Sequence, residues 1–198
     1  MFAAILDTNV LWPSLQRDFL LSMSIEGLYR PLWSDAILAE LHRHEQLKLQ
    51  DRGQDEASSI GLAGRLISQM RTHFADALVT GWDGLEGSFG LPDRDDEHVL
   101  AAAVVGGANA IVTDNLKDFP VALVPRGIQI VSAREFAQDA ADSDPESAAR
   151  ALCEMAHRRK VPQTPHELLE LLVRRYRMEA LADVVSPVLR EVALDFGL

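Results

Sequence analysis

The sequence predicts an α/β fold with a central, mainly parallel sheet between two helical layers, followed by a small all-helical unit. Short apolar runs at residues 2–6, 110–113 and 128–131 have the length and character of strands buried in a parallel sheet. Helix-like segments separate these runs, and such alternation indicates parallel pairing. No strand-like run follows the last of them, so we expect one domain at residues 1–137 and a helical extension at residues 138–198.

The first half of the chain shows helical patterns on both sides of a short extended stretch. Apolar residues recur at helical spacing over 18–28, and residues 31–33 are expected to be extended. A serine at the start of 34–47 is a typical N-cap for the next helix, and helix-like patterns continue over 54–79. Residues 80–91 are expected to form a loop, because glycine recurs there at every third position.

The second half begins with a strongly apolar helix over residues 96–105, which the following glycine pair ends. A capping box at Ser132 and Glu135 predicts the start of another helix. In the tail, a capping residue is followed three times by proline, which favours the first position of a helix. The predicted helix starts are Asp144–Pro145, Thr164–Pro165 and Ser186–Pro187.

The composition excludes several classes of protein. Of the 198 residues, 47% are hydrophobic and 25% are charged, which is enough for a core and argues against a disordered chain. Cys153 is the only cysteine, so neither an intramolecular disulfide nor a thiolate zinc site can form, and we expect it to be a small core residue of the tail. The N-terminus lacks the cationic region of a signal peptide, and no apolar stretch is long enough to span a membrane. We therefore expect a cytoplasmic protein with no membrane segment.

The formal net charge of -11 argues against a protein that holds nucleic acid by bulk positive charge alone. It fits clustered carboxylates that bind a cation, or a basic protein partner. Residues 150–177 depart from this balance, because they carry seven basic side chains against three acidic ones. This stretch could face phosphate, although a solvated helix face is the alternative. The candidate RNA contacts within it are Arg158, Arg159, Lys160, Arg174 and Arg175.

Two expected strands each end in an aspartate, Asp7 and Asp114. In open α/β sheets, ligands bind beyond the carboxyl ends of the strands. These two acids would therefore meet at one edge of the sheet if their strands are parallel and adjacent. For each of them, a turn-forming aspartate is the alternative.

Two further acids lie on or beside apolar helix faces. Glu40 borders the apolar stripe of its helix, where a boundary glutamate that reaches solvent is the alternative. Asp96 precedes Val99 and Leu100 by three and four residues and shares their apolar face, whereas Glu97 is out of phase. A carboxylate aimed inward needs a partner or a metal ion. Four carboxylates at one site would repel one another, and Mg²⁺ or Mn²⁺ would relieve that repulsion.

These residues, in this order, resemble the PIN domain family over roughly residues 1–137. Four motifs carry the resemblance: Asp7-Thr8-Asn9, Glu40 within its helix, the segment from Asp93 to Ala103, and Val112-Thr113-Asp114-Asn115 followed by Phe119. The resemblance implies a metal-dependent endoribonuclease that holds Mg²⁺ or Mn²⁺ through a set of four acids, namely Asp7, Glu40, Asp96 and Asp114. It also implies hydrogen-bonding support from Asn9 or Thr113, with Asp93 close behind the ligands.

Small bacterial members of this family are commonly VapC-type toxins of toxin–antitoxin pairs. The resemblance therefore implies structured RNA, such as tRNA or rRNA, as the substrate and a cognate antitoxin as the protein partner. Many members are dimers, so a homodimer is also expected as a possible state. The helical tail lies outside the minimal PIN pattern and looks like the extension found in a subset of these toxins.

Two other functions stay open on the sequence alone. A haloacid-dehalogenase-like phosphatase would use Asp7 as its nucleophile, but its motif requires a second aspartate at the position of Asn9. A non-catalytic binding module on a PIN scaffold would not need its acids, and all four are present. The presence of all four therefore favours the enzyme.

Histidine and tryptophan residues near the candidate acids receive ordinary structural assignments. His44 and His98 are each expected to lie at the surface rather than to bind a metal ion. The aromatic rings of Trp12, Trp33 and Trp82 could stack on bases, but packing in the core or in loops is the expectation for them.

Overall fold

The computed structural model describes all residues from 1 to 198, and its contacts group into two compact units. The sheet unit consists of residues 3–12 and 31–131, and the helical unit consists of residues 1–2, 13–30 and 132–198. One helix from the N-terminal part of the chain thus belongs with the tail. The domain boundary predicted after residue 137 cuts the chain once along the sequence, and it stays a prediction. None of the helices is both long and apolar enough to cross a membrane.

The sheet unit is built on a five-stranded sheet with the strand order β3-β2-β1-β4-β5. The strands are β1 (Ala3–Leu6), β2 (Arg30–Ser34), β3 (Leu78–Val79), β4 (Ala110–Val112) and β5 (Gln129–Val131). β1 pairs in parallel with β4, β4 with β5, and β2 with β3, and Ile5 lies opposite Ile111. All residues of β1 are buried, as expected for a strand covered on both faces. The predicted fold class, a parallel sheet flanked by helices with further helices in the tail, is confirmed.

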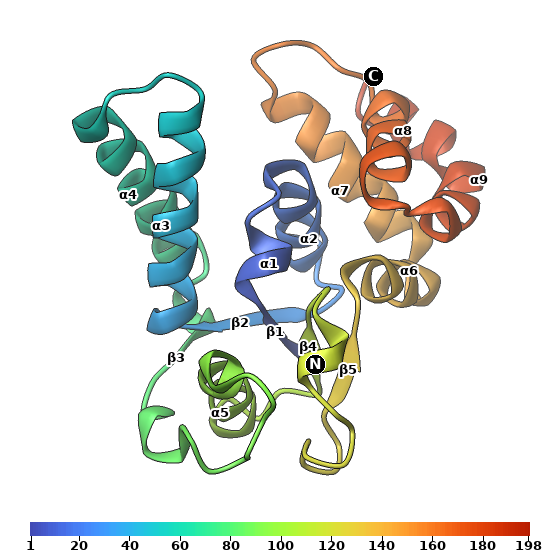
Figure 1. Ribbon diagram of the computed structural model, residues 1–198. Helices are drawn as coiled ribbons and strands as arrows, with labels where there is room; N and C mark the ends of the chain where they lie inside the picture. Colours follow the sequence, from blue (N-terminus) through green and yellow to red (C-terminus); the bar gives the residue numbers. More distant parts are fainter. The chain divides into compact units, whose positions relative to one another are not determined.

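Four α-helices belong to the sheet unit: α1 (Thr8–Leu11), α3 (Asp35–Asp51), α4 (Glu56–His73) and α5 (Glu97–Val105). Short 3₁₀ turns connect them, namely η1 (Ala75–Ala77), η2 (Asp83–Leu85), η3 (Arg94–Asp96) and η4 (Leu116–Asp118). The Ser34 hydroxyl accepts a hydrogen bond from the backbone N–H of Ile37, so the predicted N-cap of α3 is confirmed. α3 and α4 lie side by side as a helical hairpin (Figure 1).

One segment of the sheet unit differs from its predicted structure. Residues 72–79 were expected to be helix-like, but they contain the end of α4, the turn η1 and the strand β3. Val79 of β3 is buried and lies opposite Ser34 of β2. A strand of two residues is too short to show a period in sequence, so only its sheet neighbour fixes its conformation.

The helical unit contains five helices: α2 (Ser14–Ile25), α6 (Ala133–Ser143), α7 (Pro145–Arg158), α8 (Pro165–Tyr176) and α9 (Glu179–Asp195). α7 packs against α2, α8 and α9, and its run along α2 can be followed in Figure 1. The capping box at Ser132 and the caps at Asp144 and Thr164 are confirmed. Cys153 of α7 is fully buried, as expected for a core residue of the tail.

The predicted helix start at Ser186–Pro187 is wrong, because Pro187 lies inside α9. The chain instead turns at Arg177, which has a left-handed backbone with φ of 58° and ends α8. Proline inside a helix removes one backbone hydrogen bond. The helix continues through it because Val185 and Leu189, before and after the proline, are buried on its apolar face.

Two glycines make opposite predictions for stability. A Cβ at Gly106, where α5 ends, would lie 2.8 Å from Val79 Cγ2 and 3.0 Å from the Ala102 carbonyl oxygen. We expect Gly106→Ala to lower the free energy of unfolding by about 1–3 kcal/mol, because this close approach cannot admit a methyl group. Gly61 lies inside α4 with no atom within 4 Å of its added Cβ.

Gly61→Ala is therefore the matched control, and it should raise the free energy of unfolding by about 0.5–1 kcal/mol. Urea denaturation followed by circular dichroism measures both changes. Equal effects of the two substitutions would contradict the packing described for Gly106.

Candidate metal centre

The candidate site lies in the sheet unit, beyond the carboxyl ends of β1 and β4. Because these strands are parallel neighbours, Asp7 after β1 and Thr113 after β4 come together. The Thr113 hydroxyl donates a hydrogen bond of 2.7 Å to Asp7 Oδ2. The Asn9 side-chain amide donates to the same oxygen at 2.6 Å and to Thr113 Oγ1 at 2.9 Å. The three residues thus form one hydrogen-bonded group at the sheet edge.

Asp7 is only 4% exposed, and both of its carboxylate oxygens accept hydrogen bonds. The second oxygen, Oδ1, accepts from the backbone N–H of Thr8 at 2.6 Å. Burial raises the pKa of Asp7, and the hydrogen bonds from Thr113 and Thr8 only partly offset that effect. The negative charge of Glu40 raises it further.

Glu40 lies on α3 and is held from two other elements. The Thr8 hydroxyl donates to Glu40 Oε2 at 2.7 Å, and His98 Nε2 lies 3.2 Å from Glu40 Oε1. Thr8 therefore links two acids, through its backbone N–H to Asp7 and through its hydroxyl to Glu40. Burial opposes the ionisation of Glu40, but the hydrogen bonds from His98 and Thr8 outweigh it and lower the pKa.

The expectation that His98 lies at the surface is wrong, because the residue is 6% exposed. Every residue of α5 from Glu97 to Ala103 is buried, so this part of the helix has no solvent face. Burial opposes the protonation of His98, but the hydrogen bond to Glu40 and the negative charge of that residue outweigh it and raise the pKa of His98. His44, by contrast, is exposed on α3, as expected.

Glu97 was predicted to lie off the apolar face of its helix, but the residue is only 2% exposed. Its carboxylate accepts backbone N–H groups of the glycine-rich loop, at 3.1 Å from Phe89 and 2.8 Å from Leu91. These bonds lower the pKa of Glu97 despite its burial. Glu97 thus fixes the loop that precedes the candidate site instead of facing solvent.

Three carboxylates converge at the start of α5. Oxygen atoms of Asp93, Asp96 and Asp118 all lie within 4.8 Å of one another. Asp96 Oδ2 is buried and has no hydrogen-bond partner. Burial and the negative charges of Asp7, Asp93 and Asp118 raise the pKa of Asp96 to about 7. A buried carboxylate oxygen without a donor, beside two further carboxylates, is a donor set that fits a hard divalent cation.

Asp118 is a candidate that the sequence patterns missed. Of the four predicted ligands only Asp96 is in this group, and Asp7, Glu40 and Asp114 lie outside it. Asp114 is exposed, and its backbone N–H donates to Asn9 Oδ1 at 3.0 Å. The 3₁₀ turn η4, closed by a hydrogen bond from the Asp118 N–H to the Asn115 carbonyl, returns the chain to the site. A second acid just before the buried Phe119 was the available signal, but its direction depends on that turn.

A cavity of about 500 Å³ opens beside Glu40 and His98. Arg43 is its only arginine or lysine, and the other lining residues are Ala39, Glu86 and Asp95. Glu40 is therefore open to a ligand on the side of α3 and the glycine-rich loop.

The tryptophans mostly pack as expected. Trp33 is fully buried and packs edge-on against Phe74, with ring centroids 5.7 Å apart. The Trp82 indole donates to Asp35 Oδ1 at 3.0 Å and lies beside the His98 ring, 6.0 Å between centroids. Only Trp12 is well exposed, at 44%.

The candidate RNA contacts lie in the helical unit and differ in their partners. Arg158 bonds to Asp18 at 3.3 Å and to the Ser22 hydroxyl at 2.7 Å, and Arg159 lies 4.0 Å from Asp18. These two arginines therefore join α7 and its C-terminal end to α2. Lys160, Arg174 and Arg175 are exposed.

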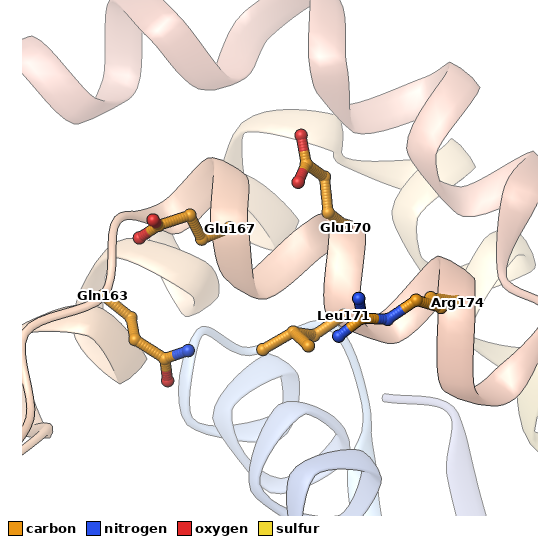
Figure 2. A pocket seen from close by; sticks show the side chains of 5 residues that line it. All are labelled: Gln163, Glu167, Glu170, Leu171 and Arg174. Carbon is orange, nitrogen blue, oxygen red and sulfur yellow. The ribbon is translucent and has the colours of Figure 1, made fainter.

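Arg174 also lines a pocket of about 280 Å³ along α8. Figure 2 shows the lining side chains on the loop before α8 and on successive turns of that helix: Gln163, Glu167, Glu170, Leu171 and Arg174. Two carboxylates line this pocket beside a single guanidinium, so its charge does not favour a phosphate group.

Comparison with known proteins adds three findings. The family described as "PIN domain" matches residues 3–117. A protein of Mycobacterium tuberculosis (strain ATCC 25618 / H37Rv), named "Putative ribonuclease VapC50", is 35% identical over 127 residues, which cover 57% of this chain and 75% of that protein. No solved structure matches the chain. The family match contains Asp7, Glu40, Asp96 and Asp114 and ends one residue before Asp118.

The raised pKa of Asp96 makes a prediction for the stability of the metal-free protein. The pKa of Asp96 is about 7 in the folded protein, against an ordinary value of 3.8 that applies to the unfolded chain. Between these two pH values the folded state therefore binds more protons than the unfolded state. The contribution of Asp96 to the free energy of unfolding therefore falls as the pH rises from 3.8 towards 7, and it does not return above pH 7. Asp96→Asn cannot ionise, so at pH 8 in EDTA it should be more stable than the parent by about 1 kcal/mol, or about 2–4 °C in Tm, after allowance for solvent screening.

The stabilisation should shrink towards zero at pH 3.5, which is below both pKa values, because the parent residue is then mostly protonated in both states. Thermal melts across the pH range measure the difference, and Asp95→Asn, at an exposed neighbour, serves as the control. Equal melting temperatures of Asp96→Asn and the parent at pH 8 would contradict the burial of this charge.

Proposed function

This chain belongs to the PIN domain family, and on that basis we propose that it is a metal-dependent endoribonuclease that hydrolyses phosphodiester bonds. The observation that supports this most directly is the convergence of Asp93, Asp96 and Asp118, with one buried oxygen of Asp96 left without a donor. The charge of Asp7 acts on Asp96 in this group, and the charge of Glu40 acts on Asp7 in turn.

The proposed ligands of Mg²⁺ or Mn²⁺ are the four acids of the family pattern together with one acid added by the geometry: Asp7, Glu40, Asp96, Asp114 and Asp118. Asp93 lies beside them, and Asn9 and Thr113 hold Asp7 by hydrogen bonds. When bound, such an ion stabilises negative charge on the scissile phosphate and lowers the pKa of a coordinated water.

The side chains of this chain prepare the site in three ways. Hydrogen bonds from Thr8, Asn9 and Thr113 fix the orientation of Asp7. Glu40, whose pKa is lowered, is ionised at neutral pH. Asp96 has a pKa of about 7, so it can release its proton near neutral pH when a cation binds. The positive charge of the cation then offsets the carboxylates, which would otherwise repel a phosphodiester. Water is the proposed nucleophile, because a divalent ion held by these acids would activate a coordinated water and no serine or cysteine nucleophile is then needed.

The phosphatase alternative loses support from the environment of Asp7. A nucleophilic aspartate needs a free oxygen aligned with the phosphorus atom. Asp7 is buried, one of its oxygens accepts from Thr8, and the other accepts from both Asn9 and Thr113. A non-catalytic module leaves the unpartnered oxygen of Asp96 unexplained.

The biological setting is proposed from the relative named as a VapC ribonuclease. We propose that the chain is the toxin of a type II toxin–antitoxin pair in the cytoplasm, with a cognate antitoxin as its partner and tRNA or rRNA as its substrate. A homodimer is part of the same proposal. Within the helical unit, the exposed Lys160, Arg174 and Arg175 are better candidates for RNA contacts than Arg158, which is bonded to Asp18.

Removal of a single site carboxylate should abolish RNA cleavage. We expect Asp7→Asn and Asp96→Asn each to lower the rate with Mn²⁺ on structured RNA by about 100-fold or more, because a neutral amide neither binds the ion well nor balances its charge. Denaturing gel electrophoresis of end-labelled tRNA and rRNA measures the rate, with Asp51→Asn, at an exposed acid at the end of α3, as the active control and EDTA as the inactive one. Cleavage by both variants at the rate of the parent would show that the site is wrongly assigned.

The two acids after β4 can be distinguished by metal binding. We expect Asp118→Asn to raise the Kd for Mn²⁺ by about tenfold and Asp114→Asn to raise it less, since only Asp118 groups with Asp96. Electron paramagnetic resonance of free Mn²⁺ during a titration gives both constants. A larger effect of Asp114→Asn would contradict this ranking and make Asp114 the stronger ligand of the two.

A further inference from the structure

The contacts of Glu40 point to a role for a residue outside the set of acids. We propose that His98 is a positioning residue, which holds the Glu40 carboxylate in the orientation required by the metal ion. The inference rests on the proposed function, because it assigns to His98 a part in that same site.

Both oxygens of Glu40 are fixed, each from a different element. Thr8, after β1, donates to Oε2 at 2.7 Å, and His98, on α5, donates to Oε1 at 3.2 Å. The Glu40 side chain is 33% exposed, so burial alone does not fix it. A glutamate side chain with this freedom loses rotamer entropy when a metal ion orders it, unless other bonds have already ordered it.

His98 is itself held in place. Its side chain is 7% exposed, and its ring lies 6.0 Å from the ring of Trp82. The Trp82 indole donates to Asp35 Oδ1 at 3.0 Å, and Asp35 begins the same helix that carries Glu40. The contacts therefore run from Asp35 on α3 to Trp82, from Trp82 to His98, and from His98 back to Glu40 on α3. Together they fix the orientation of the imidazole.

The chemistry of the ring assigns the hydrogen bond to one nitrogen. His98 Nε2 is the ring nitrogen that lies 3.2 Å from Glu40 Oε1, and because an ionised carboxylate only accepts, Nε2 is the donor, while Nδ1 is buried without a partner. An imidazole donates from Nε2 both in that neutral tautomer and when protonated. The positioning role therefore requires a hydrogen-bond donor at this place and no change of charge.

A purely structural role would be to join α3 to α5. Packing alone, however, does not call for a polar pair, because a leucine of similar size would bury apolar surface without the cost of desolvating a charge. Where a histidine or carboxylate supports a metal ligand from outside, its removal typically lowers metal affinity by 10–100-fold. The two roles therefore predict different results for an apolar replacement.

The experiment compares His98→Leu, which fills the space without a donor, with His98→Gln, whose amide restores a donor. For each variant, the Kd of Mn²⁺ is measured by electron paramagnetic resonance, and kcat and KM are measured on structured RNA. All measurements are made well below the Tm of the protein variant. We expect His98→Leu to raise the Kd by about tenfold and to lower kcat by about tenfold or more, with KM for RNA unchanged within about twofold. His98→Gln should stay within about threefold of the parent, as should His44→Ala, an exposed histidine on the helix of Glu40.

A double-mutant cycle tests whether His98 acts through Glu40. In the Glu40→Gln background, His98→Leu should change the Mn²⁺ Kd by less than about twofold, because the carboxylate that it positions is gone. A further loss of affinity in that background would overturn the proposal. Unchanged Mn²⁺ affinity and kcat in His98→Leu, with a lower Tm alone, would make the residue structural and would overturn it as well.

Failure of the proposed function gives a different result. If the parent protein neither binds Mn²⁺ nor cuts RNA, the nuclease assignment is wrong and the positioning role is wrong with it. If the parent does both and His98→Leu matches it, only the inference about His98 is wrong.

Discussion

The parallel pairing of β1 with β4 is the constraint on which the candidate site depends. It places the ends of two strands that are more than one hundred residues apart side by side, with a backbone hydrogen bond of 3.1 Å from the Asp7 N–H to the Val112 carbonyl. The side chains that follow each strand then meet, and Thr113 donates to Asp7. Thr8, one residue further, reaches Glu40 and brings α3 into the same network. A buried sheet register thus sets the positions of polar groups on three elements.

The acids at this edge are held in unequal electrostatic states. Glu40 receives two hydrogen bonds and ionises readily, whereas Asp96 has a buried oxygen without a donor and a pKa of about 7. Hydrogen bonding therefore stabilises charge on one side of the site and leaves it uncompensated on the other. An incomplete arrangement of this kind is expected where a ligand supplies the missing charge.

Much of the fold could be predicted from the sequence, because strand runs, caps and helix periods are local signals. Ser34, Ser132, Asp144 and Thr164 cap the helices as their patterns predict. The misses share a different cause. Whether Pro187 starts a helix, whether residues 78–79 form a strand, and which way a residue of α5 points all depend on packing against distant segments.

The same distinction applies to the site. Asp7 and Glu40 were found as acids at a strand end and beside an apolar stripe, and both join the network. Asp118 and His98 were missed, the first because a 3₁₀ turn aims it and the second because a helix buried on all sides has no outer face. Spacing along the chain cannot report on contacts that a turn or a surrounding layer creates. The position of Asp114 relative to the other acids likewise depends on how the chain turns after β4, which spacing along the chain does not reveal.

The grouping of α2 with the tail has a consequence for the order of events during synthesis. α2 (Ser14–Ile25) lies between the first two strands in sequence but packs against α7 (Pro145–Arg158), which is made more than one hundred residues later. The buried side chains of α2 include Phe19, Leu20 and Met23. A ribosome thus synthesises all five strands before α7 emerges, so α2 makes contacts of long sequence separation, and contacts of this kind slow folding.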